Sequence, residues 1–193
     1  MKLSNIKVEQ VDFIGRTVDD YGEIYNNKEL GEIIKVSFGI SKFKNGVAYG
    51  TYKEKQFCLC YKNVSYLGTP HSFFKKRIQI PNKYNDIYME NESNNISTFF
   101  IGIYKYKENI VFVNFNANKY IRNKLNNSSA HVMTIDLLYA TKNGYYLKTD
   151  KNGNEIFCFN ENAIDSFLNM YLVKDIDLTP KMFVLFNEFR SEE

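Results

Sequence analysis

The chain has 193 residues, a formal net charge of +3, 44% hydrophobic residues and 24% charged residues, a mix typical of a folded globular protein. No apolar run approaches the roughly 18 residues needed to span a bilayer, and the polar N-terminus lacks the apolar stretch of a signal peptide. These features argue against a membrane protein, a secreted precursor and a disordered chain.

Aromatic residues make up 16% of the chain, and aromatic side chains suit the half-buried surface of a β-sheet. Cys58, Cys60 and Cys158 are an odd number of cysteines without a CxxC pair, which predicts reduced, packed thiols in a cytoplasmic protein. The small excess of 25 Lys and Arg over 22 Asp and Glu permits a local phosphate-binding face without requiring one.

The first half of the chain reads as strands separated by turns. Apolar, β-branched or alternating runs predict strands at residues 32–40, 47–52, 55–61 and 73–80, with a turn at Lys44-Asn45-Gly46. The polar, Asn-rich segment 82–97 predicts a long surface loop. We expect a single domain over residues 1–193, with this loop as a possible junction between subdomains.

The second half contains the clearest local unit. Two strongly apolar runs, 98–106 and 109–115, flank a short polar turn and predict a central β-hairpin that is covered on both faces. A helix is expected to follow, with Ser128 or Ser129 as its N-cap and Gly144 as its stop. A second hairpin around residues 150–154 and a helix capped by Asn160 come next.

The last apolar run, 181–189, fits a strand or a short helix. The order of elements predicts an α+β fold with a mixed, mostly antiparallel sheet, a central hairpin and two principal helices.

Basic residues gather at two places in the sequence. One group lies beside His71, Phe73 and Phe74, and the other precedes the expected helix start at Ser128. Lys and Arg side chains near a helix N-terminus suit contacts to phosphate groups. The candidate DNA-binding residues are Lys75, Lys76, Arg77, Lys119, Arg122, Lys124, Ser128, Ser129 and His131.

The run Ser128-Ser129-Ala130-His131, preceded by the strand pattern Val113-Asn114-Phe115-Asn116, resembles type II restriction endonucleases of the PD-(D/E)XK superfamily, in particular BamHI-like members. The resemblance covers about 30 residues. It implies a central hairpin that carries catalytic carboxylates, a following helix behind the site, and Mg²⁺-assisted hydrolysis of a phosphodiester.

The chain departs from this family at the catalytic positions, because Asn114 and Asn116 stand where the resemblance places carboxylates. Neutral amides hold a divalent cation less well than carboxylates do. Replacement acids are available near the hairpin and on the following helix, and the metal ligands are not defined by the sequence. The candidate catalytic residues are Glu90, Glu92, Glu108 and Asp136.

Two hypotheses follow for the function. The first is a DNA-binding protein of a bacterial or phage restriction or antiviral defence system, which as an enzyme would be a Mg²⁺-dependent endonuclease that acts on double-stranded DNA as a homodimer. The alternative is a non-catalytic nucleic-acid reader, or an adaptor that binds a partner protein in a defence system. The residues leave open whether the protein is an enzyme.

Overall fold

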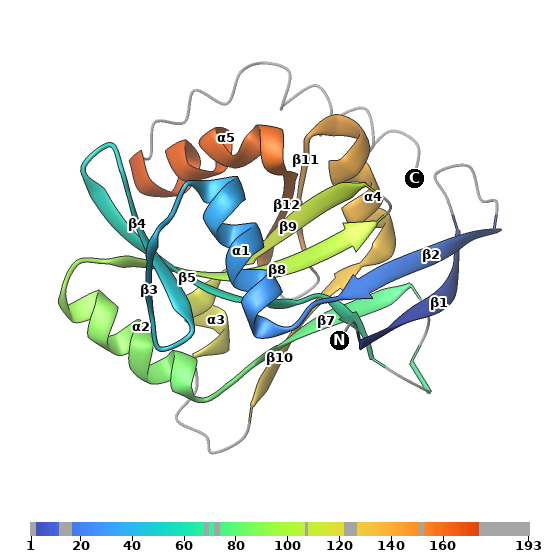
Figure 1. The fold of residues 1–193 in the computed structure, drawn as a ribbon, viewed down its shortest axis with the longest axis horizontal. Coiled ribbons are helices and arrows are strands. Elements are labelled where there is room, and N and C mark those ends of the chain that lie inside the picture. The colour runs from blue at the N-terminus through green and yellow to red at the C-terminus, as the bar shows by residue number, and fades with distance from the viewer. Residues whose placement is uncertain are drawn as a thin grey trace.

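The computed structural model describes residues 3–11, 17–67, 70–71, 74–106, 108–121, 127–150 and 153–173 (Figure 1). The predicted α+β class is confirmed, with a mixed and mostly antiparallel sheet. The larger sheet has the order β11-β12-β9-β8-β5-β4-β3, with the β1–β2 hairpin joined to β8, and a smaller sheet has the order β10-β7-β6. The strands are β1 (Leu3–Val11), β2 (Thr17–Ile24), β3 (Lys42–Lys44), β4 (Val47–Tyr52), β5 (Lys55–Asn63), β6 (Ser65–Tyr66), β7 (Lys75–Ile80), β8 (Ser97–Tyr106), β9 (Asn109–Phe115), β10 (Ser128–Met133), β11 (Tyr145–Thr149) and β12 (Glu155–Asn160).

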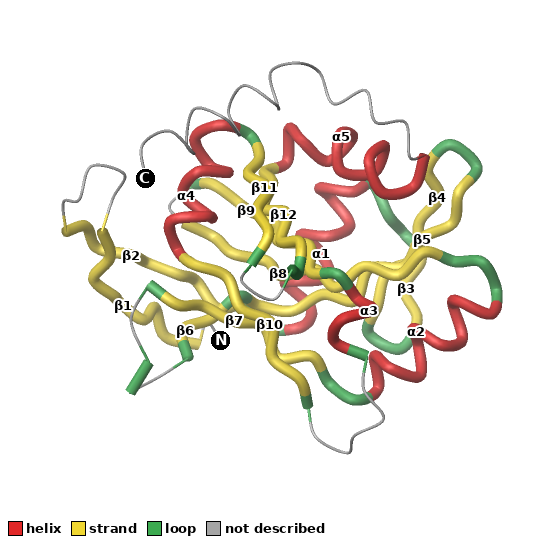
Figure 2. The backbone as a smooth tube through the Cα atoms, turned by 180° about the vertical axis from the view of Figure 1, so that it is seen from behind, coloured by secondary structure: helices red, strands yellow, loops and turns green. Residues whose placement is uncertain are grey.

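Helices lie on both faces of the larger sheet (Figures 1 and 2). They are α1 (Asn27–Phe38), α2 (Lys83–Ser93), α3 (Ala117–Tyr120), α4 (Thr134–Asn143), a 3₁₀ turn η1 (Glu161–Ala163), α5 (Ile164–Leu168) and a π-helical turn η2 (Asn169–Val173). In the described part of the chain, no helix is both long and apolar enough to cross a bilayer.

The predicted central hairpin is confirmed as β8 and β9, and it separates two cores. On one face, Ile101 and Phe112 pack with α1 and α5, and on the other face Phe100 and Val113 pack with α2, α4 and the smaller sheet. This double coverage explains why both strands are apolar at nearly every position. The three cysteines are free and buried, as their sequence context predicts.

The prediction of a strand over residues 32–40 is wrong, because residues 32–38 belong to α1. Its β-branched residues suggested a strand, but Leu30 and Ile34 are the buried pair, and they are four residues apart. Asn26 and Glu29 form a capping box at the helix start, with the Asn26 Oδ1 accepting from the backbone N–H of Lys28 and of Glu29.

The prediction of a long loop over residues 82–97 is also wrong, because most of this segment forms α2. The helix buries Tyr84, Ile87 and Asn91 within an otherwise polar sequence, so its apolar stripe is too narrow to stand out as a pattern. The terminal segment 181–189 lies outside the described residues.

The smaller sheet packs closely against β8 at Gly102. A Cβ atom on Gly102 would lie 2.6 Å from Cγ2 of Val64 and 3.0 Å from Cγ2 of Ile78 on β7. The backbone N–H of Val64 donates to the carbonyl of Ile103 at 2.8 Å. Glycine at this position therefore lets the two sheets approach closely.

Candidate nucleic-acid interface

The two longer strands of the smaller sheet have an alternating pattern. On β7, Ile78 and Ile80 are buried, whereas Lys75, Arg77 and Gln79 are more exposed. On β10, Ala130 and Val132 are buried, and the more exposed Ser129, His131 and Met133 lie opposite Gln79, Arg77 and Lys75. Because side chains alternate between the faces of a strand, the exposed members share one outer face. We call the β7–β10 pair, seen from this face, the cationic ladder.

The charges on the cationic ladder lie close together. Arg77 is directly opposite His131 in the strand register. Partial burial lowers the pKa of His131 from its ordinary value of 6.5, and repulsion from Lys75, Arg77 and His71 lowers it further. Within the described part of the chain, neither Lys75 nor Arg77 forms an ion pair. Unpaired cations that repel one another are favourably placed to bind a polyanion.

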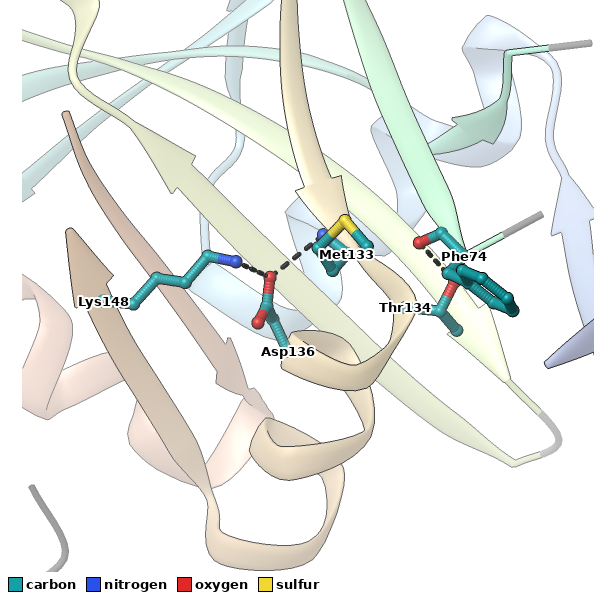
Figure 3. A network of polar contacts seen from close by, with 5 residues as sticks. All are labelled: Phe74, Met133, Thr134, Asp136 and Lys148. Carbon is teal, nitrogen blue, oxygen red and sulfur yellow. Dashed lines mark hydrogen bonds and ion pairs between the residues drawn. The ribbon is translucent and has the colours of Figure 1, made fainter. Parts of the chain in front are cut away.

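Lys76 belongs to the opposite side of the same strand. Its side chain is buried, and its Nζ donates to Oγ1 of Thr134 at 2.9 Å. The Thr134 backbone N–H and hydroxyl both donate to the carbonyl of Phe74, the latter contact being drawn in Figure 3. Of the three consecutive basic residues, only the first and third therefore reach the outer face.

The other candidate DNA-binding residues fall in several places. Lys119 is exposed on α3, and the Ser128 hydroxyl donates to the Tyr120 carbonyl at 3.0 Å. Ser129 lies on the outer face of the ladder, opposite Gln79. Arg122 and Lys124 lie outside the described residues.

The predicted helix start at Ser128 or Ser129 is wrong. The run Ser128-Ser129-Ala130-His131 forms the first part of β10, and α4 begins at Thr134. Long-range pairing with β7 decides this outcome, since the local sequence alone also permits a capped helix. Among the described candidate cations, Lys75 and Arg77 therefore lie on a strand ladder and not beside a helix that begins at Ser128.

The four candidate catalytic carboxylates lie at three separate places in the fold. Glu90 and Glu92 are exposed on α2, where Oε1 of Glu90 lies 3.7 Å from Nζ of Lys44, and Glu108 is exposed in the β8–β9 turn. Asp136 lies on α4 and is buried. No three His, Cys, Asp or Glu side chains in the described ranges are grouped so that they could hold a metal ion.

Asp136 is engaged in a local polar network (Figure 3). Its Oδ2 forms an ion pair with Lys148 on β11 and accepts a hydrogen bond from the Met133 backbone N–H at 2.9 Å. Burial raises the pKa of Asp136, and Lys148 and the Met133 N–H oppose that shift. This carboxylate caps α4 and ties the helix to the sheet.

A polar cavity of about 410 Å³ lies where β8 begins and β9 ends. The Asn114 and Asn116 side chains line it, together with Asn118, Tyr88 and Glu92. The sequence interpretation treated Asn114 and Asn116 as departures from a metal site and missed the cavity. The sequence pattern that could have indicated the cavity is the repeated Asn at alternate positions 114, 116 and 118. The last two follow the end of a buried strand.

These features define an α+β protein in which a small cationic strand ladder is seated on a larger sheet. The model of the methylase-associated X1 family (MTaX1) matches residues 55–168, more than half of the chain, and the chain belongs to this family. The matched segment begins at β5 and ends with α5, so it contains the cationic ladder and nearly all of the polar cavity. No curated protein and no solved structure matches the chain.

Proposed function

We propose that this protein is the DNA-binding component of a restriction-modification system, and that it contacts DNA phosphates through the cationic ladder. The observation that carries the proposal is the grouping of Lys75, Arg77 and His131 on one face, where Arg77 and His131 are cross-strand neighbours. The name of the family, methylase-associated, supports a role beside a DNA-modifying enzyme.

The proposed contact is local, because the net charge of the whole chain is only +3. Lysine and arginine contacts to phosphates release condensed counterions, and a two-stranded ribbon can enter the major groove of DNA. Lys119 on α3 is a further exposed cation in the matched segment.

Replacement of both ladder cations, Lys75→Gln with Arg77→Gln, is expected to weaken duplex binding by at least tenfold near 0.1 M salt. The slope of log affinity against log salt should fall by about two, because about one counterion is released per phosphate contact. Fluorescence anisotropy on a labelled duplex over a salt series measures both quantities.

The matched control is Lys28→Gln with Lys35→Gln. It removes the same charge from α1, on the opposite face of the larger sheet. Equal weakening by both double variants would contradict a specific role for the ladder. An adaptor that binds only a partner protein would show no salt-dependent affinity for DNA in either case.

Affinity for DNA is expected to rise as the pH is lowered from 7.5 into the acidic range, where His131 gains a proton. Burial, Lys75, Arg77 and His71 lower the pKa of this side chain in the free protein, so it is mainly neutral at pH 7.5. A bound phosphate offsets that repulsion and favours the charged form. Anisotropy titrations at several pH values measure the effect.

His131→Gln should flatten this pH dependence while preserving affinity at pH 7.5. His71→Gln is the control for the neighbouring histidine, which is exposed. An unchanged pH profile in His131→Gln would show that His131 does not face the DNA.

The proposal is limited to binding, because the four candidate carboxylates lie at three separate places in the fold and Asp136 is paired with Lys148. The Mg²⁺-dependent endonuclease and the homodimer stay predictions. Incubation of the same duplexes with Mg²⁺ tests the first, and the mass of the protein in solution tests the second.

A further inference from the structure

The polar cavity between β8, β9, α2 and α3 has an unusual lining. Asn, Ser, Thr and Tyr side chains supply neutral polar groups, and Tyr88, Ile96 and Phe99 supply apolar surface. Among the described residues that line it there is one acid, Glu92, and no Lys, Arg or His. Such a lining does not suit a phosphate or a carboxylate, and it suits an uncharged polar molecule with a flat apolar face.

One residue of the lining has a buried side-chain oxygen without a hydrogen-bond partner within the described part of the chain. Asn114 is only 4% exposed, and its Oδ1 accepts no hydrogen bond. The residue lies in the middle of the sheet, opposite Ile101 on β8 and Phe157 on β12. Buried side-chain acceptors are nearly always satisfied, so an orphan oxygen beside a cavity indicates a missing donor.

The Asn114 amide lies beside Tyr171 in the wall of the cavity. The Tyr171 hydroxyl donates to the Glu155 carboxylate. Since the hydroxyl proton is used by Glu155, the Tyr171 oxygen can act toward Asn114 only as an acceptor, which suits the NH₂ group of the amide. The amide oxygen is thus left as the free acceptor.

The opposite wall is held in place by α2 and α3. The Tyr88 hydroxyl contacts Oδ1 of Asn118 and lies 3.4 Å from Oε1 of Glu92. Oδ1 of Asn116 accepts from the backbone N–H of Asn118 at 3.1 Å. These contacts occupy side chains on that wall, whereas the acceptor of Asn114 stays unused.

We propose that this cavity binds a nucleobase whose exocyclic amino group donates to Oδ1 of Asn114. A nucleobase is flat, uncharged and rich in edge donors, and asparagine is a common partner of the amino edge of adenine. The volume of about 410 Å³ lies within the range of small-ligand sites. The base comes either from a free nucleoside or from DNA by flipping out of the stack, and the second source rests on the proposed function.

The test compares 2′-deoxyadenosine with 2′-deoxyinosine by calorimetry. Deoxyinosine has an oxo group in place of the exocyclic amino group and a proton on the adjacent ring nitrogen, so it lacks a donor at the exocyclic position. The unmodified protein should bind deoxyadenosine at least tenfold more tightly, because deoxyinosine would leave the Asn114 acceptor unpaired. Either of two results would overturn the proposal. One is equal affinity for the two nucleosides. The other is that neither nucleoside binds and that the amino group has no effect on the affinity for duplexes.

Asn114→Leu should abolish this preference, whereas Asn114→Asp, which keeps an acceptor, should retain a preference for the amino group. Thermal unfolding of each variant shows whether it is folded, and the adenosine–inosine comparison in the unmodified protein does not depend on either variant. A preference that survives in folded Asn114→Leu would place the base elsewhere.

Duplexes with 2-aminopurine separate the two sources of the base, because its fluorescence rises when it leaves the stack. A rise that Asn114→Leu prevents supports a flipped base. The two proposals can also fail separately. If the Lys75→Gln and Arg77→Gln double variant keeps its nucleoside selectivity, and the unmodified protein does not bind DNA, the result supports the nucleobase site and refutes the proposed function.

Discussion

Asp136→Ala is expected to lower the free energy of unfolding by about 3 kcal/mol, the cost of removing one partner from a buried ion pair. The carboxylate is 4% exposed, and the substitution removes both its ion pair with Lys148 and its hydrogen bond from the Met133 N–H. Because the Lys148 side chain is 25% exposed, part of its charge is still solvated. Denaturant unfolding measures the loss.

Asp136→Asn separates the two contributions. The amide still accepts from the Met133 N–H, so this variant should lose less stability than Asp136→Ala. Adding Lys148→Met to Asp136→Asn should recover stability, because a buried pair replaced by uncharged side chains of similar size is often neutral or better. If Asp136→Ala is as stable as the unmodified protein, the carboxylate has no structural role and its predicted catalytic role regains support.

Gly102→Ala is expected to lower the free energy of unfolding by about 2 kcal/mol, which is typical of overpacking a filled core. The new methyl group would lie 2.6 Å from Cγ2 of Val64 and 3.0 Å from Cγ2 of Ile78. Valine and isoleucine are stiff at their branched carbons, so the backbone of one sheet must shift. Thermal or denaturant unfolding provides the measurement.

The matched control is Gly31→Ala on α1. There the added methyl group lies 3.5 Å from the Tyr61 hydroxyl oxygen, an ordinary contact, and alanine favours a helix over glycine by about 1 kcal/mol. Stabilisation by Gly31→Ala beside destabilisation by Gly102→Ala is the expected pattern. If Gly102→Ala does not lower the free energy of unfolding, the two sheets are not closely packed at this point.

Local patterns predicted the elements that form from neighbouring residues. The β8–β9 hairpin, the strand β5 and the β11–β12 hairpin follow from apolar runs next to polar turns. Elements decided by distant partners were not predictable in this way. Ser128 and Ser129 are compatible with a helix cap, and only pairing with β7 makes them part of a strand.

The candidate interface was predicted in part. The group around Lys75 and Arg77 was visible in the sequence, and strand alternation explains why Lys76 points inward. The placement of His131 opposite Arg77 depends on register between segments about 50 residues apart, which composition does not encode. The orphan oxygen of Asn114 likewise exists only once β8, β9 and β12 are assembled.

The two strands of the cationic ladder flank the central hairpin in the chain, with β7 before it and β10 after it. The hairpin joins adjacent segments, so closing it costs little conformational entropy. The ladder can form only after β10, a strand synthesised much later than β7, has been made. A nascent chain leaving the ribosome can therefore form the central hairpin before the charged face. Under the proposed function, DNA binding therefore requires the chain at least through β10, because the ladder does not exist before that strand is made.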